Sequence, residues 1–243
     1  MDAVYVCRKG DENEELRYSL RSLATNAPFV QKVWIAGYMP RWVEGVGYIR
    51  VVQGWPHKAK NVRENLRAVT ANRAVSDDFI LMNDDFYIMK PITEIPVLQR
   101  GPLYLVVQGQ KERRGGTSSY LRYAIETGRL LESWGFKPDD ILAYNLHVPM
   151  VMNKEKLKQT ILKMGDTVMG AHLRTVYGNM HHVGGELIKD RKDIADHTAT
   201  FVSSSDRAFA ADTKNRKGKA GQGLAQMIRA AFPDPSRFEG DVQ

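Results

Sequence analysis

Short apolar runs alternate with amphipathic stretches along the first half of the chain. In residues 12–28, three leucines recur at helical spacing and put one apolar stripe on a helix that Pro28 ends. A similar stripe predicts a second helix over residues 58–75. Continuous apolar runs predict buried strands, which we place at residues 2–7, 32–37, 48–53, 78–89 and 102–109. Buried strands that alternate with helices indicate an α/β sheet covered on both faces.

The pattern becomes less regular after residue 110. We expect helices over residues 118–134 and 154–164, a strand over residues 145–153, and short strands at residues 186–190 and 199–205. A basic, glycine-rich stretch at residues 212–223 is typical of a loop. The length of 243 residues fits one large domain, so we treat residues 1–243 as a single unit with two halves, 1–110 and 111–243.

A polar triplet, Asn83-Asp84-Asp85, interrupts the apolar run of residues 79–92. Burying an unpaired carboxylate is costly, so the pair must meet water, a cation or a donor group. Two carboxylates at a strand end commonly hold a Mg²⁺ or Mn²⁺ ion that bridges two phosphates. The alternative is a turn whose aspartates cap nearby amides. Because apolar residues continue on both sides, we favour the cation site, with Asp84 and Asp85 as its ligands.

Several other polar residues are candidates for the same site. In open α/β sheets, ligands bind beyond the carboxyl ends of the strands, where Arg8 follows the first predicted strand. Lys58 and Asn61 open the second predicted helix and either face a nucleotide or sugar or are ordinary surface. His147 stands in an apolar segment, as a core histidine or as a general base. Arg174 lies in a predicted helix, as a solvated side chain or as a bidentate phosphate ligand.

Composition restricts the class of protein. The formal net charge of +7 favours anionic partners such as nucleotides, phosphates or nucleic acid. The single cysteine, Cys7, excludes an internal disulfide framework and a cysteine zinc cluster. No apolar run approaches the ~20 residues that span a bilayer. A strand follows Met1 too closely for a signal peptide, so we expect a cytoplasmic protein without a membrane partner.

Two segments resemble the Stealth family of sugar-phosphate transferases. The first is "ELRYSLRSLATNAPFVQKVWIAGYMPRWV" at residues 15–43, and the second is "DDFILMNDDFYIMKPI" at residues 77–92. Further along, "NLHVPMVMNKE" (145–155), "FVSSSD" (201–206) and "FPDPSRFE" (232–239) are similar to the family's later blocks. The family's opening Trp-Val-Asp-Gly-like motif is replaced here by "VYVCRKGD", and the chain is shorter and more basic than the eukaryotic members.

The resemblance implies a GT-A-like nucleotide-sugar-binding sheet flanked by helices, with a small C-terminal α/β extension. Residues 1–110 would bind the nucleotide-diphosphate sugar, and residues 111–243 would contribute the acceptor and catalytic half. The implied enzyme moves a glycosyl or sugar-1-phosphate group to a hydroxyl. Its catalytic residues would be His147 together with Asp84 and Asp85, which hold the metal–diphosphate end or activate the acceptor hydroxyl. Around the donor would lie Arg8, Lys58, Asn61, Asn83, Arg174 and Asn179, with Asp206 nearby.

The acceptor is predicted from charge and from likeness to short glycosyltransferase-like proteins of bacteriophages and actinobacteria. A pliable basic segment at residues 212–223 suits a polyanion, and we predict DNA with a hydroxylated base, modified in the cytoplasm of a phage host. The competing class is a basic module that binds nucleic acid without chemistry. That class leaves the Asp84-Asp85 pair unexplained, because carboxylates repel phosphate unless a cation lies between them.

Overall fold

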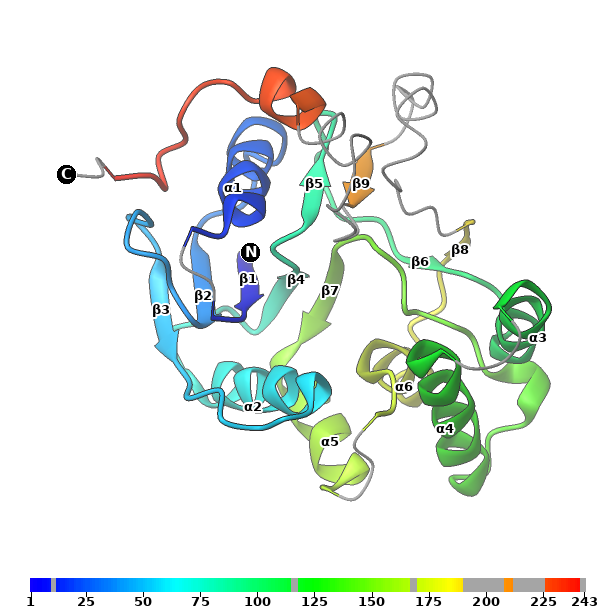
Figure 1. Ribbon diagram of the computed structural model, residues 1–243. Helices are drawn as coiled ribbons and strands as arrows, with labels where there is room; N and C mark the ends of the chain where they lie inside the picture. Colours follow the sequence, from blue (N-terminus) through cyan, green and yellow to red (C-terminus); the bar gives the residue numbers. More distant parts are fainter. Residues whose placement is uncertain (10–11, 115–117, 167–169, 190–207, 212–225, 241–243) are drawn as a thin grey trace.

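The computed structural model describes residues 1–9, 12–114, 118–166, 170–189, 208–211 and 226–240 (Figure 1). Its central sheet has the strand order β3-β2-β1-β4-β7. The parallel members are β1 (Asp2–Cys7), β2 (Val33–Gly37), β3 (Gly47–Arg50) and β4 (Asp78–Met82). At one edge, β7 (Met150–Asn153) runs antiparallel to β4. The expected α/β sheet is confirmed.

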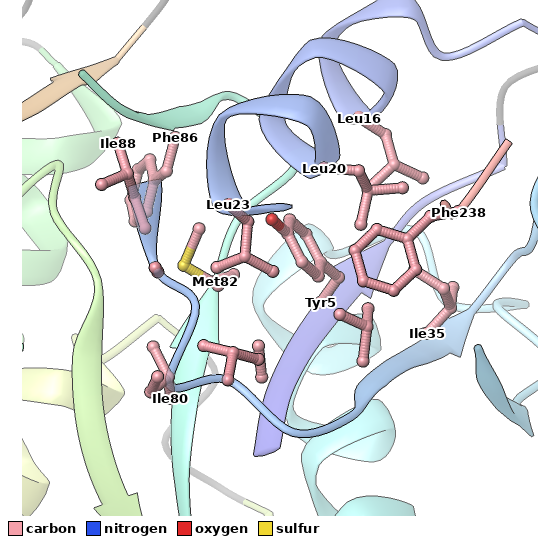
Figure 2. Packing of buried hydrophobic residues seen from close by; sticks show 14 of the residues in the cluster. Tyr5, Leu16, Leu20, Leu23, Ile35, Ile80, Met82, Phe86, Ile88 and Phe238 are labelled. Atoms are coloured by element: carbon pink, nitrogen blue, oxygen red, sulfur yellow. The ribbon is translucent and has the colours of Figure 1, made fainter. Parts of the chain in front are cut away.

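Helices cover both faces of this sheet, as the continuously apolar strands require. The helix α1 (Glu14–Asn26) lies on one face, where its leucines pack against Tyr5, Ile35, Ile80 and Met82 (Figure 2). The other face is covered by α2 (Lys58–Ala71), α5 (Lys154–Met164) and α6 (Leu173–Met180). The side chains of β1, β2 and β4 therefore alternate between two separate apolar clusters.

Three further parts adjoin the sheet. Beyond β7 lie α3 (Leu103–Arg114), α4 (Ser119–Ser133) and the short 3-10 helix η1 (Pro138–Asp140) (Figure 1). A parallel pair joins β6 (Leu98–Gln99) to β8 (Glu186–Leu187), and an antiparallel pair joins β5 (Phe86–Ile88) to β9 (Phe209–Ala211). In the described part of the chain, no helix is both long and apolar enough to cross a membrane.

The last described segment, residues 226–240, closes over α1 and β5. Residues 226–231 are helical, and Ile228 and Phe232 pack against Tyr87 of β5. Phe238 belongs to the same apolar cluster as the leucines of α1 (Figure 2). The C-terminal end of the described chain thus completes the core beneath the first helix.

Two sequence predictions are wrong, and three predicted strands are too long. Residues 102–109 form no strand but the start of α3, because a short apolar run does not by itself distinguish a helix from a strand. The predicted strand 78–89 is two strands in different sheets, since the chain turns at residues 83–85 and β5 leaves the central sheet. The strand predicted at 48–53 ends at Arg50, and the strand predicted at 186–190 ends at Leu187. The predicted strand 145–153 covers only β7. The predictions for residues 199–205 and 212–223 fall outside the described residues.

Candidate active site

The parallel strands bring several of the predicted site residues to one edge of the sheet. Arg8 directly follows β1, and Asn83-Asp84-Asp85 directly follows the neighbouring strand β4. Because β7 is antiparallel and Met150 pairs with Leu81, the chain that enters β7 arrives at this same edge. His147, three residues before β7, therefore comes to the edge where Asp84 and Asp85 lie. This is the edge at which open α/β sheets bind ligands.

The triplet forms a tight turn between β4 and β5. The backbone amide of Phe86 donates to the carbonyl of Asn83 at 3.3 Å. Asn83 is exposed, Asp84 and Asp85 are half-buried, and the Oδ1 atom of Asp85 is covered. The side-chain amide of Asn13 donates from Nδ2 to Oδ2 of Asp84 at 3.1 Å. The backbone is thus the turn considered as the alternative, and the carboxylates lie at the carboxyl ends of the parallel strands.

Polar side chains of α1 hold the strand that follows this turn. Ser19 donates from Oγ to the carbonyl of Phe86. The amide of Ile88 donates to Oγ of Ser22 at 3.0 Å, and Nδ2 of Asn26 donates to the carbonyl of Ile88 at 2.7 Å. These bonds satisfy buried backbone groups of β5 on the side that faces α1. The helix therefore fixes the position at which β5 leaves the Asp84-Asp85 turn.

His147 and Arg174 meet at the aromatic ring next to Asp85. The rings of His147 and Phe86 have centroids 6.4 Å apart and cross at 74°. The guanidinium carbon of Arg174 lies 5.5 Å from the centroid of the Phe86 ring. Arg174 donates from Nη1 to the carbonyl of Leu146 at 2.6 Å and from Nη2 to that of Val148 at 2.7 Å. Arg174, which the sequence suggested as a phosphate ligand, therefore donates hydrogen bonds to the backbone on both sides of His147.

The other predicted residues have different surroundings. Lys58 begins α2 and is exposed. The side chain of Asn61 makes two hydrogen bonds with the backbone of Trp55. Its Oδ1 accepts from the Trp55 nitrogen at 3.2 Å, and its Nδ2 donates to the Trp55 carbonyl at 2.8 Å. The buried Asn179 makes the same exchange with the backbone of Leu142, at 2.8 and 2.7 Å. The amides of Asn61 and Asn179 thus hold loops, and Asp206 lies outside the described residues.

The sequence marks Asn65, which lies at the ends of β1 and β2, only by its helical spacing from Asn61, as ordinary surface or as an amide that faces a nucleotide or sugar. Asn65 of α2 is only 1% exposed, and its Oδ1 has no hydrogen-bond partner among the residues that the structure describes. Gly37 has φ of 107°, and a Cβ atom there would lie 2.3 Å from the carbonyl oxygen of Cys7. That carbonyl also accepts from Nε2 of Gln53 at 2.5 Å. Helical spacing from Asn61 was the one signal for Asn65, while nothing local marks Asn13, which caps α1.

The chemistry of the donor set is compatible with a hard divalent cation. Asp84 and Asp85 offer carboxylate oxygens and Asn83 an amide oxygen, which are the ligand types that Mg²⁺ and Mn²⁺ prefer. Within the described ranges, no group of three or more His, Cys, Asp or Glu residues is arranged to hold a metal ion. The residues present therefore suit an ion that takes one or two carboxylates and completes its shell with water and substrate phosphates.

Known structures share this arrangement of strands and helices. The galactosyltransferase LgtC, in complex with donor and acceptor sugar analogues, is 13% identical, has a TM-score of 0.55, and aligns over 97% of this chain and 96% of its own. An active-site mutant of LgtC is 10% identical, with a TM-score of 0.52 and 98% of both chains covered. The central, mostly parallel sheet flanked by helices is thus a GT-A-like fold.

Comparisons at the level of sequence are negative. No family model and no curated protein matches the chain. The resemblance to the Stealth family therefore rests on the motifs quoted above and on no further match. The fold alone is shared with LgtC, and the chemistry must be argued from this chain's own residues.

Proposed function

We propose that this protein is a glycosyltransferase that uses a nucleotide-diphosphate sugar and transfers a glycosyl or sugar-1-phosphate group to a hydroxyl. One observation supports the proposal: Asp84, Asp85 and the His147 segment all lie at the carboxyl ends of the parallel strands of a GT-A-like sheet. LgtC, the neighbour with this fold, is a galactosyltransferase crystallised with donor and acceptor sugar analogues. The fold and the carboxylate pair are independent observations, and both support transfer from a nucleotide-diphosphate sugar.

In this proposal Asp84 and Asp85 hold a Mg²⁺ or Mn²⁺ ion. When bound, the ion would neutralise charge on the departing nucleotide, which is a nucleoside diphosphate in glycosyl transfer and a nucleoside monophosphate in sugar-1-phosphate transfer. Arg8 is exposed at the end of the neighbouring strand and supplies a second positive charge for the phosphates. Asn65 lies at the carboxyl ends of β1 and β2, and its Oδ1 has no hydrogen-bond partner among the described residues. In the proposal this oxygen accepts a hydrogen bond from the nucleotide.

His147 is the proposed general base, with an aspartate of the triplet as the alternative. It takes the proton of the acceptor hydroxyl as the oxygen attacks the donor. Its geometry depends on Arg174, whose hydrogen bonds to the carbonyls of Leu146 and Val148 hold the peptide groups on either side of it. Arg174 thus acts on the histidine through the backbone, and the proposed phosphate ligand is Arg174 or Arg8.

Hydrolysis of nucleotide-diphosphate sugars, measured across a panel of bases and sugars with Mn²⁺, tests the proposal. Asp84→Asn and Asp85→Asn should abolish turnover, and His147→Ala should lower kcat by roughly 10²–10⁴. Asp78→Asn is the matched control, because Asp78 lies at the opposite, amino end of the same strand β4. All four variants should melt within a few degrees of the unchanged protein. Full activity of Asp84→Asn and Asp85→Asn in a chelator would refute the metal-dependent mechanism.

For the acceptor we keep DNA with a hydroxylated base as the proposal, supported by the net charge of +7. The basic stretch 212–223 that motivates it lies outside the described residues. The test is the electrophoretic mobility of a duplex across a salt series, in which binding should weaken steeply between about 50 and 200 mM salt. A chain that binds duplex but never hydrolyses a donor would instead be the non-catalytic nucleic-acid module. Absence of duplex binding at low salt would leave a saccharide or protein hydroxyl as acceptor.

A further inference from the structure

Asn13 makes two bonds with one side-chain amide. Its Oδ1 accepts from the backbone amide of Leu16 at 3.4 Å and so caps the first turn of α1. Its Nδ2 donates to Oδ2 of Asp84 at 3.1 Å, across 71 positions of sequence. The residue adopts φ of 40°, in the left-handed region that asparagine adopts more readily than most residues other than glycine. This backbone conformation occurs where the side chain reaches the candidate metal site.

The helix that Asn13 caps is bonded to the C-terminal segment and to β5. Glu14, the next residue, pairs with Arg229 of the C-terminal segment at 2.6 Å. Further along α1, the side chains of Ser22 and Asn26 bond the backbone of β5. The hydrogen bond from the Leu16 amide fixes the direction of the Asn13 Oδ1 atom. In that side-chain orientation the Nδ2 atom points toward Asp84. The amide is therefore oriented before any ligand arrives.

We propose that Asn13 is a positioning residue for the cation. Its amide binds one carboxylate oxygen of Asp84 and thereby turns the other toward the ion, as groups behind a metal ligand commonly do. The inference rests on the proposed function, in which Asp84 is a metal ligand. It adds a residue outside the quoted motifs, from the loop between β1 and α1.

The alternative is that Asn13 serves only the helix, and the chain contains a comparison for it. Asn153 caps α5, accepting from the amides of Glu155 and Lys156 at 3.1 and 3.2 Å. Its Nδ2 donates to Oδ1 of Asp78 at 2.9 Å, at the amino end of β4. The same cap-and-carboxylate chemistry thus occurs at both ends of one strand, but only Asn13 lies at the ligand-binding edge.

The experiment compares Asn13→Gly with Asn153→Gly. Glycine adopts positive φ without strain and is tolerated at a helix cap, so Asn13→Gly removes the amide and keeps the backbone. Binding of Mn²⁺ alone is followed by the electron paramagnetic resonance signal of the free ion, and melting by circular dichroism. The dissociation constant for Mn²⁺ should rise by about 10-fold or more in Asn13→Gly, and change less than about twofold in Asn153→Gly.

Each outcome decides the question. If the unchanged protein binds Mn²⁺ and Asn13→Gly binds it equally well, Asn13 is only a cap, and the proposed function stands. If the unchanged protein binds no Mn²⁺, the metal assignment and this inference fall together, whereas donor hydrolysis still tests the transferase. Should Asn13→Gly fail to fold, Asn13→Ser takes its place, because serine keeps a capping oxygen and lacks the amide donor. Weaker Mn²⁺ binding at an unchanged melting temperature confirms the positioning role.

Discussion

Glu239 joins the C-terminal segment to α1, and its neutralisation should lower stability strongly. Its carboxylate accepts from Nε and Nη2 of Arg21 at 2.8 Å each, from Nη1 of Arg17 at 2.9 Å, and from the amide of Ser236 at 2.8 Å. The side chain of Glu239 is 3% exposed and that of Arg21 is 9% exposed. Breaking a buried ion pair from one side leaves an uncompensated charge and costs about 3–5 kcal/mol.

Glu239→Gln is the variant to make, because it keeps the shape and removes the charge. A loss of about 3–5 kcal/mol corresponds to about 6–20 °C in Tm for a chain of this size. The matched control is Glu14→Gln, which breaks the other ion pair between α1 and this segment. The side chains of Glu14 and Arg229 are 35% and 47% exposed, so that loss should stay below about 1 kcal/mol. Equal melting temperatures for the two variants would refute the argument from burial.

The same carboxylate predicts a dependence on pH. Burial alone would raise the pKa of Glu239, but the hydrogen bonds from Arg21 and Ser236 together with the Arg21 charge hold it below its ordinary value of 4.5. A group with a lowered pKa contributes stability that is complete above its unfolded pKa and is lost as the pH falls through the folded pKa. Urea midpoints of the unchanged protein should therefore drop below about pH 4.5 more than those of Glu239→Gln. Parallel acid profiles would contradict the assignment.

Two further predictions concern His172 and Gly37. Burial, reinforced by the charge of Arg100, lowers the pKa of His172 to about 4. Below about pH 6.5 the unfolded chain therefore binds a proton on His172 that the folded chain does not bind. Between about pH 6.5 and pH 4 the urea midpoint of the unchanged protein should fall by more than that of His172→Phe. Equal falls in the two proteins would count against the prediction. Gly37→Ala should destabilise by at least about 2 kcal/mol, since φ is 107° and the new Cβ would lie 2.3 Å from the Cys7 carbonyl oxygen. Gly54→Ala, where a Cβ meets nothing within 4 Å, should change Tm little, and similar losses in both variants would be evidence against steric exclusion at Gly37.

Periodicity predicted the elements whose environment is uniform. The strands β1 and β2 are buried on both faces, and α1 and α5 present one apolar stripe, so local composition carries their structure. The apolar residues of α3 form an uninterrupted run, which is why the sequence predicted a strand there. In the structure α3 buries one face, which packs against α4. Local pattern could not reveal the neighbouring element that an apolar run would meet.

The candidate site was predictable in the same unequal way. A pair of carboxylates inside an apolar run is visible along the chain, so Asp84 and Asp85 could be singled out. The antiparallel return of β7, which brings His147 to them, is a property of topology and follows from no spacing. The hydrogen-bond partner of Asp84 could not be predicted either. Asn13 is 71 positions away, and in the sequence it looks like an ordinary helix N-cap residue.

The polar residues of the "RYSLRSLATN" segment act on the candidate site through the backbone of β5. Arg17 and Arg21 bind Glu239, and Ser22 and Asn26 bind the backbone of β5. On a helix that covers a sheet, such side chains would be costly to bury without partners, and here each has one. Since β5 begins where the Asp84-Asp85 turn ends, these bonds determine where the carboxylates lie. A substitution in this segment should therefore disturb the turn through the backbone of β5, even though no residue of the segment needs to meet the donor or the acceptor.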